Sequence, residues 1–141
     1  MTEYAPLKLL AADAEDLKVV ASALQDAVAK IGDIEFDARR RLLTIGFNRY
    51  CWEVGSDLRV RSGLQVGSVM GLQARNLRRH ARDAVVELLT IAFEPDEEPG
   101  GALILSFSGG GDLRARVECV DLVLADVSAP WPARRTPTHD L

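Results

Sequence analysis

The sequence predicts one α+β domain in which a mostly antiparallel, curved sheet or small barrel packs against an N-terminal helix and a short C-terminal helix. Three observations carry this prediction. A helical apolar stripe follows an N-cap signal near the N-terminus, and apolar residues alternate with a period of two through most of the middle. Short turn signals join the alternating segments, which favours antiparallel neighbours over parallel ones.

The first element is a short apolar strand at residues 7–11, and a helix follows it. Asp13 is a good N-cap, and Glu15 and Asp16 place negative charge in the first turn, where the helix dipole favours it. An apolar stripe then recurs at helical spacing, formed by Leu17, Val20, Ala21, Leu24 and Val28. We expect this helix to end near Ala27.

From residue 34 the period changes to two, which is typical of strands. Ile34 and Phe36 lead into a turn at 37–40, and a long strand follows, with one face formed by Leu43, Ile45, Phe47 and Cys51. Residues 59–75 are predicted to form a hairpin whose loop is 66–68. Its shared face would consist of Val60, Ser62, Leu64, Met70, Leu72 and Ala74.

Two further strand regions follow. Residues 85–93 are dense in β-branched and large apolar residues. Residues 103–119 are predicted to form a second hairpin that turns at the glycine run 109–111, with Phe107 opposite Leu113. A hairpin turn is favoured over a phosphate-binding loop at these glycines, because no lysine and no helix follow them.

After Cys119 the spacing of apolar residues returns to a helical one, formed by Val120, Val123, Leu124 and Val127, with Asp121 as the N-cap. Pro130 would stop this helix. A barrel capped by it, like the pleckstrin-homology superfold, is the specific topology that we expect. The domain is predicted to span 1–127, and 128–141 to form a Pro-rich tail with Trp131 packed back on the domain.

The composition favours a cytoplasmic protein. No apolar run is long enough to span a membrane, and the N-terminus lacks the pattern of a signal peptide. The two cysteines, Cys51 and Cys119, lie in apolar contexts without metal-ligand spacing. We expect both to be reduced core thiols.

Several segments resemble one family over nearly the whole chain. They are residues 6–17, the central Arg41-Leu-Leu-Thr-Ile-Gly-Phe-Asn-Arg-Tyr-Cys-Trp-Glu53, and, in the C-terminal half, 99–101, 113–121 and 128–131. The chain is similar to a family of short bacterial proteins catalogued as a domain of unknown function. The resemblance implies a free-standing domain, and it implies no activity, substrate or catalytic residue.

The charge distribution is the feature that points to a partner. Residues 39–82 hold ten arginines against Glu53 and Asp57, although the chain as a whole carries a net charge of −4. One interpretation is that the acidic ends fold against this basic middle. The other is that an acidic protein or a small anionic ligand docks on a surface formed by Arg59, Arg61, Arg75, Arg78 and Arg79. A pI near 5.2 disfavours nucleic acid.

No catalytic, cofactor-binding or metal-binding residue is predicted, because the sequence contains no dense polar constellation, cofactor fingerprint or metal-ligand spacing. Among the carboxylates, Glu118 and Asp121 come nearest to a candidate acid–base pair. The preferred prediction is therefore a non-enzymatic interaction or regulatory module. The alternative is a small-ligand-binding protein or enzyme whose site, inside the curved sheet, uses Arg49 and Glu53. The sequence leaves the oligomeric state open.

Overall fold

Within the part of the chain that the structure describes, the fold is a curved, mostly antiparallel sheet of eleven strands with one α-helix, α1, at Ala14–Ala23. The computed structural model describes residues 3–54 and 57–133. The strands are β1 Lys8–Ala11, β2 Val28–Lys30, β3 Ile34–Asp37, β4 Leu42–Tyr50, β5 Leu58–Val66, β6 Val69–Arg75, β7 Val85–Pro95, β8 Gly101–Phe107, β9 Asp112–Val117, β10 Leu122–Asp126 and β11 Trp131–Pro132. Two 3₁₀ turns, η1 Ile31–Asp33 and η2 Trp52–Val54, interrupt the sheet.

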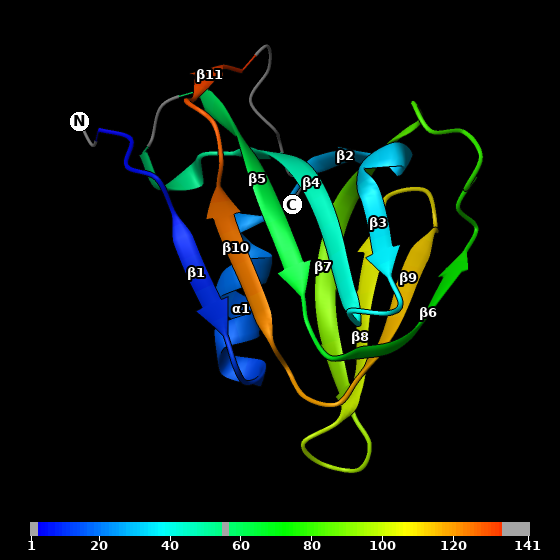
Figure 1. Ribbon diagram of the computed structural model, residues 1–141. Helices are drawn as coiled ribbons and strands as arrows, with labels where there is room; N and C mark the ends of the chain where they lie inside the picture. The colour runs from blue at the N-terminus through cyan, green and yellow to red at the C-terminus, as the bar shows by residue number, and fades with distance from the viewer. Residues whose placement is uncertain (1–2, 55–56, 134–141) are drawn as a thin grey trace.

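The strands run in the order β1-β10-β5-β4-β2-β7-β8-β9-β6, with β3 paired to β4 and β11 paired to β5. The sheet folds over into two layers (Figure 1). One layer holds β1, β10, β5, β4 and β3, and the other holds β7, β8, β9 and β6. The short strand β2 connects them, because it pairs with β4 on one side and with β7 on the other.

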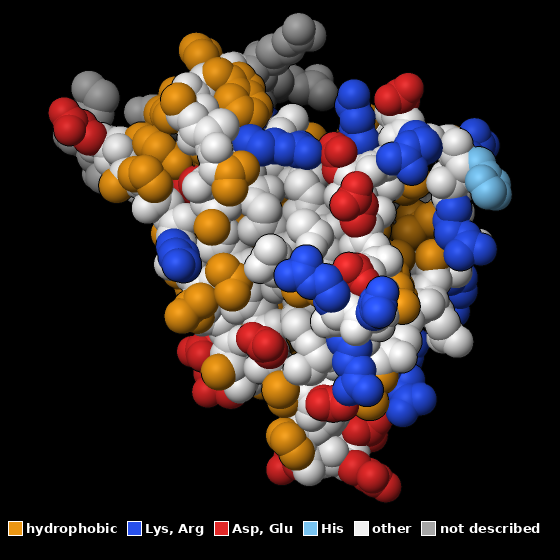
Figure 2. Space-filling model, in the orientation of Figure 1, with side chains coloured by type: hydrophobic (Ala, Val, Ile, Leu, Met, Phe, Trp, Pro, Cys, Tyr) orange, Lys and Arg blue, Asp and Glu red, His pale blue; other side chains and the backbone are white. Residues whose placement is uncertain are grey.

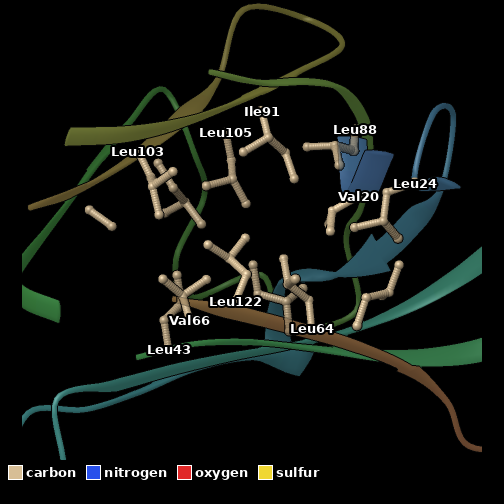
Figure 3. Close-up of a cluster of buried hydrophobic side chains, with 14 of the residues drawn as sticks. Val20, Leu24, Leu43, Leu64, Val66, Leu88, Ile91, Leu103, Leu105 and Leu122 are labelled. Atoms are coloured by element: carbon tan, nitrogen blue, oxygen red, sulfur yellow. The ribbon is translucent and has the colours of Figure 1, made fainter. Parts of the chain in front are cut away.

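The hydrophobic core lies between these layers (Figure 3). Leu103 and Leu105 of β8 face Leu43 of β4 and Leu64 of β5, and all four side chains are fully buried. This arrangement follows from the two-residue period of the strands, which sends alternate side chains to the inner face. The predicted inward faces of β4, β8 and β9 are confirmed in this respect.

The helix α1 packs against β1 and β7, and in Figure 1 it lies behind β1 and β10. Its N-cap is Asp13, as predicted, and the Asp13 carboxylate accepts a hydrogen bond of 2.8 Å from the backbone N–H of Asp16. Leu17 and Val20 enter the core. The helix is one turn shorter than expected, because Asp26 adopts a left-handed conformation (φ 62°) and the chain then enters β2.

The predicted C-terminal helix is wrong, because residues 122–126 form strand β10. This strand pairs with β1 on one edge and with β5 on the other, and it buries Leu122 and Leu124 in the core. The residues that suggested a helix are largely valines, which favour strands. Pairing with the open edges of β1 and β5 therefore stabilises a strand here more than the helical spacing stabilises a helix. Without this helix, and with an open sheet, the pleckstrin-homology-like arrangement is not the one found.

The hairpin predicted for residues 59–75 is also wrong. The turn at 67–68 is where we expected it, but β5 is already paired with β4 and β10, so β6 cannot join it. The chain crosses there to the other layer, and β6 pairs with β9. A bulge near its start leaves Met70 exposed while Leu72 faces inward, so the predicted shared face breaks.

The hairpin of β8 and β9 is confirmed, with the glycine run in its turn. Gly109 and Gly110 have positive φ angles of 89° and 93°, which glycine adopts without strain. The register differs from the expected one by two residues, since Leu105 and not Phe107 lies opposite Leu113. A shift of two leaves every side chain on the predicted face.

The predicted boundary between domain and tail falls between β10 and β11. Trp131 pairs with Arg59 of β5, so the start of the tail lies along the sheet. The remainder of the predicted tail, 134–141, lies outside the described residues. In the part of the chain that the structure describes, no helix is both long and apolar enough to cross a membrane.

Candidate functional site

A buried ion cluster joins the middle of the sheet to both ends of the described chain. The Arg49 side chain on β4 is 0% exposed and forms a two-point ion pair with Asp126 at the end of β10, through Nε (2.9 Å) and Nη2 (2.8 Å). Arg49 also pairs with both carboxylate oxygens of Glu53 at 3.0 and 2.8 Å. Two-point pairing of a guanidinium with a carboxylate is strong and geometrically specific.

Groups of the protein itself satisfy the hydrogen-bonding capacity of the Arg49 guanidinium in this cluster. Each of the five N–H groups of Arg49 has an acceptor, the last being the carbonyl of Tyr50. Asp126 accepts three further hydrogen bonds, from the Tyr4 hydroxyl (2.8 Å), the Leu7 N–H (2.8 Å) and the Ser62 hydroxyl (2.7 Å). Such a cluster stabilises the fold, because it ties the N-terminal segment to β4, β5 and β10.

The electrostatics agree with a structural role. Burial alone would raise the pKa of Asp126, but the hydrogen bonds from Arg49, Leu7, Ser62 and Tyr4 outweigh it and lower the pKa to about 2. The hydrogen bonds from Arg49 likewise lower the pKa of Glu53. Burial, followed by the hydrogen bond to Asp126, raises the pKa of the Tyr4 hydroxyl. Arg49 and Glu53 were the residues of the alternative enzyme prediction, and the donors of Arg49 are all engaged.

The other residues considered for chemistry also have structural partners. Cys51 is buried beside Val54 and Val60, and burial raises the pKa of its thiol, which opposes reactivity. Glu118 forms an ion pair of 2.7 Å with Arg41 at the surface. Among the residues that the structure describes, no group of three or more His, Cys, Asp or Glu side chains could hold a metal ion.

The five arginines of the predicted partner surface divide into two sets. Arg59 and Arg61 lie on β5 and are engaged: Arg59 donates to the Asn48 carbonyl (3.2 Å), and Arg61 donates to Asp33 (2.9 Å). Arg75, at the end of β6, is paired at 2.8 Å with Asp112 of β9.

Arg78 and Arg79 form the other set. They lie in the segment 76–84, which connects β6 to β7. Both side chains are exposed, and neither makes a hydrogen bond or ion pair with any other described residue. These two arginines are therefore the members of the predicted surface whose side chains have neither a hydrogen-bond acceptor nor an ion-pair partner among the described residues.

An apolar groove lies beside this segment, between the edge strands β3 and β6. We call it the β3–β6 groove, and its cavity measures about 170 Å³. Its apolar walls and floor come from β3 with η1, from β6 and the segment that follows it, and from β9: Ile31, Ile34, Phe36, Leu72, Ala74, Leu77 and Leu113. Figure 2 shows apolar surface exposed at this place, flanked by basic side chains.

Arginines stand at the rim of the groove. Arg79 and Arg82 both line it, from the segment 76–84. Arg82 is held in place, because its backbone carbonyl accepts a bond of 2.8 Å from the Gly32 N–H and its guanidinium donates to the Gly32 carbonyl (3.3 Å). A Cβ on Gly32 would lie 3.1 Å from that Arg82 carbonyl, so the glycine permits the close approach. The groove thus combines an apolar interior with a cationic rim.

Arg79 belongs to the predicted partner surface, whereas Arg82, although part of the basic run 39–82, was not assigned to that surface, and the groove was not predicted. One signal was present: Leu77 is a large apolar residue inside the basic segment Asn76-Leu-Arg-Arg-His-Ala-Arg82. It packs against the core and lines the groove. The partner of Arg49 was also missed, because Asp126 lies 77 residues away and within the segment that was predicted to be helical.

Comparison with proteins of curated function found no match, and comparison with solved structures found none. A family model matches residues 7–139, which is nearly the whole chain. It covers every strand and the helix described above and confirms the resemblance seen in the sequence. The chain belongs to the family described as "Protein of unknown function (DUF2948)".

Proposed function

We propose that the protein is a non-enzymatic interaction module that binds an acidic protein segment at the β3–β6 groove. The observation that carries this proposal is the pairing of an apolar groove with arginines at its rim, one of which, Arg79, has no partner among the described residues. An exposed apolar surface beside uncompensated positive charge favours a ligand that is both apolar and anionic.

The size of the groove favours a protein segment over a free small molecule. Sites that enclose a small molecule usually measure about 300–1,000 Å³. The β3–β6 groove, at about 170 Å³, is smaller and would take an apolar anchor side chain. The guanidinium groups of Arg79 and Arg82 would then meet carboxylates that flank the anchor, since arginine presents a donor fork that matches carboxylate geometry.

We place this interaction in the bacterial cytoplasm. Both cysteines are free thiols, with Cys51 buried and Cys119 half-buried. Unpaired thiols fit a reducing compartment, where disulfides are rare.

The test is a selection of short random peptides displayed on phage, followed by fluorescence anisotropy with the enriched sequences. We expect enrichment of peptides that combine large apolar residues with Asp or Glu. Arg79→Glu should weaken their binding by about tenfold or more, which is about 1.4 kcal/mol. The matched control is Arg40→Glu, the same charge change at another exposed arginine whose side chain has no partner among the described residues and does not line the groove.

Three results would overturn the proposal: no enriched peptide, enrichment of basic or neutral peptides, or equal effects of Arg79→Glu and Arg40→Glu. A labelled single-stranded oligonucleotide serves as a further probe. If it binds and Arg79→Glu abolishes that binding while no peptide is enriched, the partner is a nucleic acid and not a protein.

A further inference from the structure

Both strands that border the β3–β6 groove are edges of the sheet. β3 pairs with β4 and β6 pairs with β9, and within the described residues neither has a second neighbouring strand. Half of the backbone N–H and C=O groups of an antiparallel strand point away from its partner. β6 is held at its start, where the Val69 N–H donates to the Arg41 carbonyl (3.0 Å). From Gly71 to Arg75 its outer edge makes no further backbone hydrogen bond to the described chain.

The inward side chains of these two edges are less covered than their partners on the next strand. Leu72 is half-buried and Ala74 is exposed, although the residues opposite them on β9 are buried. The same contrast occurs on β3, where Ile34 and Phe36 are half-buried and their partners on β4 are fully buried. On the groove side, the apolar side chains of β3 and β6 that face the core therefore have no neighbouring strand among the described residues to cover them.

We propose that the partner binds as an added strand along the free edge of β6. This inference rests on the proposed function and specifies its geometry. Backbone hydrogen bonds to β6 would supply affinity, and alternate side chains of the partner, with a period of two, would enter the groove over Leu72 and Ala74. The partner is then an extended segment in which large apolar residues alternate with acidic ones, the acidic ones placed within reach of Arg79 and Arg82.

Two further free edges in the described sheet, those of β3 and β1, fit such a partner less well. β3 has only four residues. β1 is also an edge strand, but it has only four residues and α1 packs against it. β6 has seven residues and borders an apolar cavity with a basic rim. Charge complementarity to an acidic strand is therefore present at β6.

The test uses the peptides selected above, in three arms. Backbone N-methylation of the peptide, one residue at a time, removes single hydrogen-bond donors, and we expect affinity to fall by about tenfold at alternate positions. Amide exchange followed by NMR should show slower exchange on binding at alternate residues between Gly71 and Arg75. Ala74→Glu places a carboxylate in the groove and should reduce affinity by about tenfold or more, while Gln73→Glu, its neighbour on the opposite face of β6, should not.

The outcomes separate this inference from the function on which it rests. Strand addition would be refuted if no single N-methylation lowered affinity and no amide of β6 exchanged more slowly on binding. If Arg79→Glu still weakened binding in that case, the proposed binding module would remain supported. Protection confined to β1 or β3 would refute the assignment to β6. Loss of the Arg79→Glu effect would remove the proposed function and this inference together.

Discussion

The cluster of Arg49 and Asp126 makes a quantitative prediction about stability. Asp126→Asn keeps the shape of the side chain but replaces one carboxylate oxygen by an NH₂ group. Oδ1 accepts two hydrogen bonds and Oδ2 accepts three. In either orientation of the amide, its NH₂ group faces an N–H of Arg49, which cannot become an acceptor, whereas the Ser62 and Tyr4 hydroxyls can turn to accept. Each unsatisfied buried donor costs about 1–3 kcal/mol, and Arg49 also loses the charge of its buried partner.

We therefore expect Asp126→Asn to lower the free energy of unfolding by about 3–5 kcal/mol, the range found when one partner of a buried pair is removed. The assay is urea unfolding at equilibrium, followed by circular dichroism. The matched control is Asp112→Asn, which removes an ion pair whose Arg75 side chain is 76% exposed and should cost about 1 kcal/mol or less. Ser62→Ala, which deletes one donor to Asp126, should fall between the two.

A loss of unfolding free energy in Asp126→Asn no larger than that in Asp112→Asn would contradict this prediction. That result would mean that solvent or local movement satisfies the donors around position 126, and that the cluster does not hold the N-terminal segment to the sheet.

Three further predictions concern pH, the core and the thiols. Folding lowers the pKa of Asp126 from 3.8 to about 2, so the contribution of this carboxylate to stability is full above about pH 4 and is lost as the pH falls through about 2. The urea midpoint should therefore fall more over this pH range in the wild type than in Asp126→Asn, and equal slopes would contradict the assignment. Leu64→Ala, at 0% exposure, should cost about 2–5 kcal/mol in urea unfolding, whereas Leu10→Ala, at 66% exposure, should cost about 0.5 kcal/mol or less; similar costs would argue against the core as described. Iodoacetamide should modify Cys119 before Cys51 in the native protein, because Cys51 is buried and burial raises the pKa of its thiol. Mass spectrometry measures the order of modification, and the reverse order would show that the structure around Cys51 opens.

Much of the local structure could be predicted because its causes are local. Asp13 caps α1 with its own side chain, and Asp37 organises the turn before β4 by accepting the N–H groups of Arg39 and Arg40. Alternation of apolar residues predicted which side chains of β4, β8 and β9 face the core. These features depend on neighbours a few residues away, so they are legible in one sequence.

The candidate site was only partly accessible in this way. The charge run predicted a basic surface, and Arg79 belongs to it. The sequence gives no sign that Arg61 is paired with Asp33 or Arg75 with Asp112, because these partners lie 28 and 37 residues away. The tertiary structure therefore decides which of the arginines remain without an internal partner.

The sequence by itself determined a sheet-rich α+β chain, a capped N-terminal helix, most of the faces of the strands and a basic middle segment. Only the tertiary structure decided that residues 122–126 are a strand and that β5 and β6 separate into different layers. The physical reason is competition for strand edges. A segment with mixed preferences becomes a strand when two edges are open to it, as β1 and β5 are to β10. Both edges of β5 are already paired, so β6 pairs with β9 in the other layer, and β6 therefore lies at the edge of the groove.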